Sequence, residues 1–281
     1  MALEDVCKSR SRAKPASLLD FDVPVAECLQ ENPPRSGTPQ NPLPFEMSHG
    51  TTTLAFTFQG GVLAAGDTRS SCSGRVSCPD AEKVKPIHSH LVATSSGTSA
   101  DCTLWKRILA RELRLYQLRH GRRVSTGGAA KLLWHMLLPF KGTKLCVATT
   151  LCGWDESGPA IFYVHSDGRR LRGTLFSVGS GSPYAYAVLD QAVESGMTAE
   201  EATRVAREAV YRATHRDAYS GNCVDIYLVT STGWTRRERE DLKEEYYRER
   251  KNLARPRSAH PKPALNETSM IEWSQPHPSK T

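Results

Sequence analysis

The sequence predicts an α+β fold: a four-layer αββα sandwich of two stacked, mostly antiparallel sheets flanked by helix pairs. Short alternating apolar segments separated by tight turns predict strands that are joined as hairpins and therefore pair antiparallel. The elements come in the order strands, two helices, strands, two helices, strand. Two such sheets stacked face to face, with the helix pairs outside, bury every apolar face in one core.

The first strands are predicted directly after residue 50. Residues 54–58 alternate between apolar and small or polar side chains, which is typical of a strand. Gly60-Gly61 predicts a hairpin turn. Residues 62–65 predict a buried return strand that leads into Asp67, and more short strands are expected before the first helix.

Two helices are expected next. The first runs from about Ser99 to His120, and Gly121 ends it. The second covers about Ser125 to Leu138. The apolar residues expected on the buried face of the first helix are Leu104, Trp105, Ile108, Leu109, Leu115 and Tyr116.

The second half of the patterned region repeats this order. A helix is expected at about 184–194, and another begins at Thr198, where Thr198 and Glu201 have capping-box spacing, and runs to about His215. The strands expected around these helices cover residues 145–152, 160–165, 171–178 and 223–229.

Three zones divide the chain. Residues 1–50 are rich in Pro, Ser and charged residues, which disfavours regular structure. Residues 51–235 carry the dense strand and helix pattern and form the expected folded domain. Residues 236–281 are a charged tail that is expected to be loosely ordered toward its end.

Composition excludes several classes of protein. The net charge of +7 is spread over Arg-rich helical faces without a zinc-finger, basic-zipper or RNP pattern, so a nucleic-acid-binding role rests on charge alone. No apolar run has the length of a secretory signal or a membrane span. None of the eight cysteines forms a CxxC pair or has zinc-ligand spacing, so we expect reduced thiols in an intracellular protein.

The Gly50-Thr51 bond directly precedes the first strand, and it is the most informative candidate site. If this bond is cut, Thr51 becomes N-terminal, so that its hydroxyl can attack a carbonyl while its own amine takes the proton. A buried Lys83, held by Asp67, can tune the hydroxyl. Gly97 lies at a strand-to-helix junction, where a backbone N–H can stabilise an oxyanion.

Each of these signals has an ordinary structural explanation. Asp67 and Lys83 can form a structural or surface pair, and Gly97 can be a simple helix entry. Residues 179–182 form a polar turn that is too short for a phosphate-binding loop. Helix capping explains residues 216–221 equally well.

In their joint order, however, these segments resemble the proteasome β subunits among the N-terminal-nucleophile hydrolases. The resemblance covers about residues 50–234. The motifs that carry it begin at Thr51, Gly66-Asp67, Lys83, Ser96-Gly97, Phe176 and Arg216. The segments that are similar to the chymotrypsin-like β5 group are His49-Gly50-Thr51-Thr52-Thr53-Leu54-Ala55-Phe56, Cys152-Gly153-Trp154-Asp155 and Ser180-Gly181-Ser182-Pro183-Tyr184-Ala185-Tyr186.

The resemblance implies a role for each matching residue. Thr51 would be the nucleophile, its amine the proton acceptor, and Gly97 the oxyanion donor, while Asp67 and Lys83 would tune the hydroxyl. The residues implied to form a polar network around the amine are Ser180, Asp217 and Ser220. Residues 1–50 would be a propeptide that is removed by cleavage between Gly50 and Thr51 during ring assembly.

The resemblance also implies partners and surroundings. The chain would assemble with other proteasome α and β subunits in a stacked-ring core, in the cytoplasm and nucleus. Its substrates would be peptides and unfolded proteins. Neither a metal nor an organic cofactor is implied, and neither nucleic acid nor a membrane is an expected partner.

The implied substrate pocket departs from the apolar lining usual in this group. Its positions are occupied by Ser70, Ala81, Lys85, Ser95, Ser99 and Thr103. A buried hydroxyl without a partner costs roughly 1–3 kcal/mol, so such a wall holds water and favours large apolar P1 side chains poorly. This lining is similar to that of the thymus-specific (type 11) branch of the group.

Two alternatives remain open at this stage. Lys85 can either direct its ammonium out to solvent or give the pocket positive character. The chain as a whole can also be a non-catalytic subunit that only builds the ring. The joint presence of Gly50, Thr51, Asp67 and Lys83 argues against this second alternative, because ring building needs none of them.

Overall fold

The computed structural model describes residues 50–72 and 74–254. The chain forms two compact units that divide between Lys243 and Glu244. The first unit holds both sheets, and the second holds nearly all of helix α7 (Lys243–Ala254). The expected propeptide up to residue 49 and the tail from residue 255 lie outside the described residues.

One sheet has six strands, and every strand pair in it is antiparallel. Its order is β10-β1-β2-β11-β12, with β13 also paired to β11. The bounds are β1 Thr53–Phe58, β2 Gly61–Asp67, β10 Leu175–Val178, β11 Cys223–Thr230, β12 Gly233–Arg236 and β13 Glu240–Asp241.

The second sheet has five strands in the order β5-β6-β7-β8-β9 and is also antiparallel throughout. Strands β3 and β4 form a separate two-stranded hairpin. The bounds are β3 Ser70–Cys72, β4 Arg75–Cys78, β5 Val84–His88, β6 Leu91–Gly97, β7 Val147–Asp155, β8 Gly158–His165 and β9 Arg170–Gly173.

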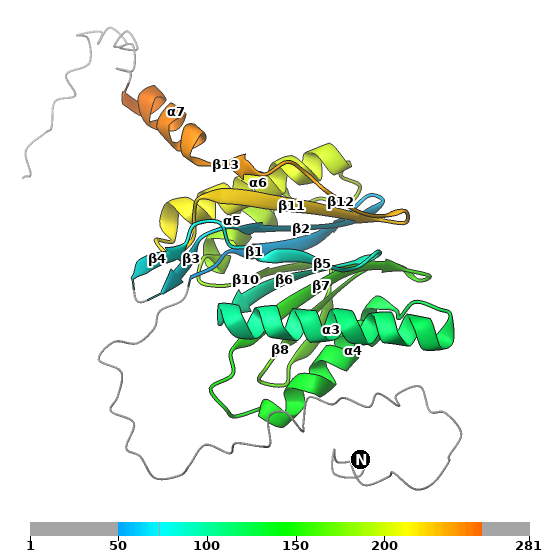
Figure 1. Cartoon of the computed structure of the whole chain (residues 1–281). Helices are drawn as coiled ribbons and strands as arrows, with labels where there is room; N and C mark the ends of the chain where they lie inside the picture. The colour runs from blue at the N-terminus through cyan, green and yellow to red at the C-terminus, as the bar shows by residue number, and fades with distance from the viewer. Residues whose placement is uncertain (1–49, 73, 255–281) are drawn as a thin grey trace, which may run out of the picture. The chain divides into compact units, whose positions relative to one another are not determined.

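A pair of helices covers the outer face of each sheet (Figure 1). Helices α3 (Ser99–His120) and α4 (Thr126–Leu137) pack on the five-stranded sheet, and the 3-10 helix η1 (Leu138–Phe140) follows α4. Helices α5 (Ser182–Ala192) and α6 (Ala199–Arg216) pack on the six-stranded sheet. The αββα sandwich expected from the sequence is therefore confirmed, as is the capping box between Thr198 and Glu201.

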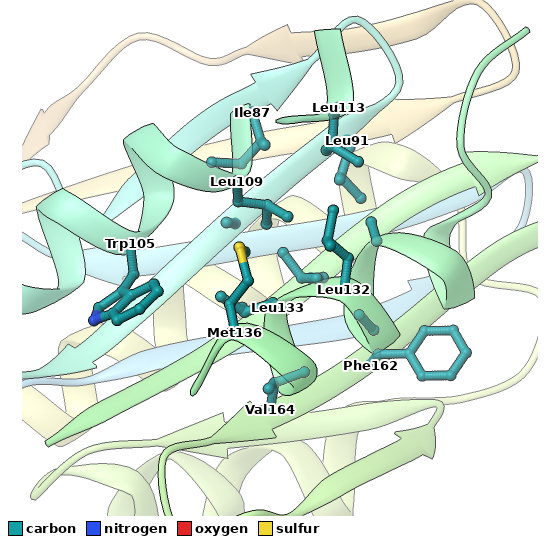
Figure 2. Packing of buried hydrophobic residues seen from close by; sticks show 14 of the residues in the cluster. Ile87, Leu91, Trp105, Leu109, Leu113, Leu132, Leu133, Met136, Phe162 and Val164 are labelled. Atoms are coloured by element: carbon teal, nitrogen blue, oxygen red, sulfur yellow. The ribbon is translucent and has the colours of Figure 1, made fainter. Parts of the chain in front are cut away.

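Buried apolar side chains fill the space between these layers. Figure 2 shows the cluster that α3 and α4 form with the five-stranded sheet, to which Leu109 of α3 and Leu133 of α4 both contribute. A second cluster includes Ala64 of β2, Val92 of β6 and Ile161 of β8, so it lies between the two sheets. The core thus holds together the two sheet faces whose strand ends carry the candidate site residues.

The single strand expected over residues 171–178 is wrong. The structure divides this segment at Thr174 into β9, which pairs with β8, and β10, which pairs with β1 in the other sheet. The carbonyl of Thr174 accepts a hydrogen bond from the N–H of Thr57, so the chain changes sheet without losing its backbone pairing.

The buried face expected for α3 is only partly correct. Trp105 and Leu109 are buried as expected, but Leu104 is 46% exposed. Lys106 and Glu112 are buried instead, because packing against the sheet and specific polar partners decide the face.

Candidate active site

The Gly50-Thr51 bond is buried at the entrance to β1, and Thr51 is only 8% exposed. The hydroxyl of Thr51 donates a hydrogen bond of 2.6 Å to the carbonyl oxygen of Gly50. The ammonium of Lys83 lies 3.4 Å from the same oxygen. A nucleophilic oxygen and a cation are therefore both held at the carbonyl of the bond that the sequence predicts to be cut.

Gly50 occupies a position where no other residue fits. A Cβ atom added there would lie 1.7 Å from the Cβ of Tyr219 and 2.7 Å from its Cα. Both are atoms that a side-chain rotation cannot move away. Close contact with the 217–222 loop thus requires glycine directly before Thr51.

Lys83 and Asp67 form a buried ion pair with 2.6 Å between Nζ and Oδ1. Asp67 ends β2 in one sheet, and Lys83 directly precedes β5 in the other. The carboxylate also accepts hydrogen bonds from the backbone N–H groups of Thr52, Arg69 and Gly221. Its oxygens are therefore well paired, which fixes the lysine beside the carbonyl of Gly50.

Burial lowers the pKa of Lys83 from its ordinary value, because an ammonium away from water loses its hydration. The negative charge of Asp67 opposes this shift but does not reverse it. A lysine with a lowered pKa releases its proton more readily, which suits a group that supports proton transfer at a neighbouring hydroxyl.

A second polar network lies at the backbone nitrogen of Thr51. The backbone N–H of Thr51 donates to Oγ of Ser180 at 3.1 Å. The hydroxyls of Ser180 and Ser220 both donate to Oδ2 of Asp217, at 2.5 Å and 2.6 Å. Ser180 lies between β10 and α5, and Asp217 is the C-cap of α6, so the fold brings these three residues together at the nitrogen that cleavage would free.

Sequence reasoning missed two members of this network. Thr52 Oγ1 lies 2.8 Å from Ser220 Oγ, and Thr52 is the donor because Ser220 gives its hydrogen to Asp217. The backbone N–H of Gly181 donates to the carbonyl of Thr51 at 3.2 Å. Only tertiary contacts between distant segments identify these roles, although the Gly-Ser-Gly turn itself was visible in the sequence.

Gly97 is the last residue of β6 and has a φ of +110°. A Cβ there would lie 2.3 Å from the carbonyl oxygen of Cys146, so this position also requires glycine. The hydroxyls of Ser96 and Thr53 are 3.2 Å apart, which brings the end of β6 beside the start of β1. The expected oxyanion donor thus lies one residue from a contact with the strand that follows Thr51.

The expected pocket residues occupy two surroundings. Ser95 is buried, and its N–H and hydroxyl both donate to the carbonyl of Lys83. Ala81 donates its N–H to the carbonyl of Thr68, directly after Asp67 in the chain. These two positions therefore adjoin the Lys83–Asp67 pair.

The other four positions are partly or largely exposed. Ser70 on β3 is partly buried and accepts a hydrogen bond from Ser77. Ser99 and Thr103 are exposed and lie one turn apart on α3. Lys85 forms an ion pair of 3.3 Å with Glu82, and about half of each side chain is exposed, so its ammonium lies at the surface.

A buried lysine that sequence reasoning did not single out lies beside Ser95. The ammonium of Lys106, on α3, donates to Oγ of Ser95 at 2.9 Å. Lys106 follows Ser99 by seven residues and Thr103 by three, which places all three on one face of the helix. This spacing is the signal that could have identified it.

No metal or membrane feature is found in the described part of the chain. Across residues 50–72 and 74–254, no cluster of three or more His, Cys, Asp or Glu side chains could hold a metal ion. Within the same ranges, no helix combines the length and apolar character needed to span a bilayer. The six described cysteines are free thiols, and Cys7 and Cys28 lie outside the described residues.

Comparison with known proteins places this geometry in context. The model of the Proteasome family, described as proteasome subunit, matches residues 47–229. The chain is 46% identical to the proteasome subunit beta type-8 of Rattus norvegicus over 197 residues, which cover 70% of this chain and 71% of that protein. It is also 46% identical to the beta type-5-A subunit of Arabidopsis thaliana, over 70% of this chain and 72% of that protein. Identity to the beta type-5 subunit of Dictyostelium discoideum is 43%, over 74% of this chain and 78% of that protein.

Proposed function

The chain belongs to the proteasome subunit family, and from that premise we propose that Thr51 becomes its N-terminal nucleophile when the chain cleaves its own Gly50-Thr51 bond. The chain is a threonine endopeptidase of the N-terminal-nucleophile type and is similar to β5-type subunits of the 20S core. Its assembly with other proteasome subunits follows from the same family membership. The proposal concerns how the catalytic threonine is made and which peptides it receives.

The contact between the Thr51 hydroxyl and the Gly50 carbonyl is the observation that carries the proposal. In the first step, Oγ of Thr51 attacks the carbonyl carbon of Gly50 and loses its proton to the surrounding polar groups. The C–N bond then breaks as the departing nitrogen takes up that proton, which leaves Gly50 as an ester on Oγ and frees the amine of Thr51. Water hydrolyses the ester and releases residues 1–50.

The mature site uses the same groups on peptide substrates. The freed amine would remain beside Ser180, whose hydroxyl is held by Asp217. An α-amine has a pKa of about 7.7–8.0, which suits a base that takes the proton from Oγ near neutral pH. The N–H of Gly97 would stabilise the oxyanion, and water would release the acyl group from Thr51.

The proposed specificity differs from a strong chymotrypsin-like preference. Ser70, Ser95, Ser99 and Thr103 contribute hydroxyls where an apolar lining would favour large apolar P1 side chains. We therefore propose that the subunit cleaves peptides only weakly after Phe. A fluorogenic peptide panel tests it on assembled particles, and cleavage after Phe that equals or exceeds cleavage after small, polar or acidic residues contradicts it.

The physiological part of the proposal rests on similarity to the thymus-specific (type 11) branch. The supporting segments are Arg69-Ser70-Ser71-Cys72 and Ser96-Gly97-Thr98-Ser99-Ala100-Asp101. On this basis the subunit would act in the cytoplasm and nucleus of thymic cells. It would generate MHC class I peptides that shape CD8 T-cell selection.

N-terminal sequencing of the subunit in assembled particles tests the cleavage step. The expected sequence is Thr-Thr-Thr-Leu, beginning at Thr51. Thr51→Ala should retain the full N-terminal segment and lose covalent labelling by epoxyketone inhibitors, which need both the hydroxyl and the amine. Thr235→Ala, an exposed threonine on β12, is the matched control and should be processed normally. An intact N-terminal segment in the wild-type particle would favour the non-catalytic, ring-building alternative.

A further inference from the structure

Lys106 is a buried cation without a carboxylate partner in the described part of the chain. Only 5% of the residue is exposed, and its ammonium donates to the hydroxyl of Ser95. Among residues 50–72 and 74–254, no Asp or Glu oxygen lies within ion-pair distance of it. A neutral hydroxyl satisfies one of the three N–H donors but does not balance the charge.

Such an arrangement is unfavourable in the chain by itself. A buried ammonium that is not paired with an opposite charge loses its hydration without recovering the energy elsewhere. Burial accordingly lowers the pKa of Lys106 to about 8. A carboxylate that approached this site would restore the charged form and gain from it in turn.

The position of Lys106 indicates where such a carboxylate would come from. Ser99, Thr103 and Lys106 share one face of α3, and the first two are exposed while Lys106 lies deeper. Its partner Ser95 also donates to the carbonyl of Lys83, the lysine that contacts Gly50. The ammonium therefore reaches the expected pocket residue Ser95 from the side of α3.

The charged and titratable groups around Lys106 do not balance its positive charge. The thiol of Cys102 lies on the same helix, and burial raises its pKa to about 11, so it stays neutral near neutral pH. Lys85 and Glu82 act on Lys106 from the side of β5, but they already form an ion pair with each other. Lys85 is therefore balanced within the chain, whereas Lys106 is not.

We infer that Lys106 is a specificity-determining residue that makes the proposed P1 pocket favour substrates with a carboxylate side chain, Asp or Glu, at P1. The inference rests on the proposed function, because the pocket matters only if Thr51 is the nucleophile. A P1 carboxylate would face a cation that water screens poorly. A P1 amide of the same shape would lack this attraction.

Fluorogenic peptides that differ only in Glu or Gln at P1 test the inference on assembled particles. Rates from particles that carry Thr51→Ala are subtracted, so that only cleavage by this subunit is compared. Wild-type particles should cleave the Glu peptide about tenfold better than the Gln peptide in kcat/KM, and Lys106→Met should bring the ratio close to one. Lys131→Met, an exposed lysine on α4, is the matched control and should leave the ratio within about twofold of the wild-type value.

The pH dependence gives a second, independent readout. The wild-type Glu-to-Gln ratio should fall as the pH rises above about 8, since Lys106 then loses its charge. Lys106→Arg should keep its preference over the same pH range, because a guanidinium stays protonated. This variant also serves as the test if Lys106→Met does not assemble.

The outcomes separate the inference from the proposed function. If Thr51→Ala removes no activity, the proposed function fails. If Thr51-dependent cleavage is present but Lys106→Met keeps the wild-type ratio, or wild type and Lys106→Arg show the same flat pH profile, the specificity inference alone is overturned. Impaired release of residues 1–50 with an unchanged ratio would likewise overturn it and assign Lys106 to a subunit contact.

Discussion

Two lysines, Lys83 and Lys106, are buried to nearly the same degree near the candidate site, at 7% and 5% exposed. Lys83 has the carboxylate of Asp67 at 2.6 Å, whereas Lys106 has only the hydroxyl of Ser95 at 2.9 Å. The first charge is balanced within the chain and can serve as a permanent part of the site. The charge of Lys106 is not balanced by any carboxylate of the described residues, so it remains available to a carboxylate from outside them. Burial alone therefore does not define the role of a lysine, and the partner decides it.

The largest effect is expected from removing the balanced charge. Lys83→Met leaves Asp67 buried and uncompensated, which should lower the free energy of unfolding by about 3–5 kcal/mol. It should also abolish cleavage before Thr51. Denaturant unfolding of the unprocessed chain and N-terminal sequencing of the particle measure the two effects. Lys131→Met, on the exposed side of α4, is the control. A loss below about 1 kcal/mol would remove the contrast between the two lysines.

Lys106→Met is expected to raise the free energy of unfolding, whereas Lys83→Met lowers it. The pKa of Lys106 in the folded chain, about 8, lies below the ordinary value of 10.5, so the unfolded chain binds more protons between these values. Burying the ammonium therefore costs stability below about pH 8, and this cost disappears as the pH rises past about 10.5. Lys106→Met should raise the free energy of unfolding by up to about 3 kcal/mol near pH 7 and by close to zero near pH 11. Unfolding curves at both pH values measure this, and destabilisation at the lower pH would contradict it.

A double variant sharpens the contrast further. Asp67→Asn combined with Lys83→Met removes both charges of the buried pair. The double variant should be more stable than the sum of the two single losses implies, by about 2 kcal/mol, because neither charge is left alone. It should still not be processed. Strict additivity of the two unfolding free energies would show that the pair does not act as a unit.

The smallest effect is expected at the surface. Lys85 and Glu82 are each about half exposed, so Lys85→Met should change the free energy of unfolding by less than about 0.5 kcal/mol. Unfolding at low and high salt measures it, and the small difference should vanish at high salt. A loss above about 1 kcal/mol would place Lys85 with the buried lysines.

Most of the fold could be predicted from local patterns, and the exceptions have physical causes. Gly173 directly precedes the change of sheet at Thr174, but a single glycine within residues 171–178 also occurs inside continuous strands, so only pairing with different neighbours reveals two strands. Helix α3 buries Lys106 and Glu112, although its pattern favours the exposed Leu104. Tertiary packing determines that face, and a single sequence does not carry this information.

The candidate site was likewise predictable from the sequence only in part. Thr51, Asp67 and Lys83 could be proposed from their order in the chain. The structure pairs Asp67 with Lys83 and brings this pair into contact with the two chain neighbours of Thr51, Gly50 and Thr52. The supporting donors from Thr52 and Gly181 depend on contacts across more than a hundred residues. Local pattern contains no trace of such contacts, which is why these residues were not expected.

The contact between Gly50 and Tyr219 also has a consequence for the accuracy of cleavage. A slip of the chain by one residue would place His49 or Thr51 against the Cβ of Tyr219, and both carry a Cβ of their own. Only one alignment of the chain therefore fits the loop. Mature subunits should have a single, uniform first residue rather than ragged ends, and any foreign leader joined to this domain has to finish in glycine.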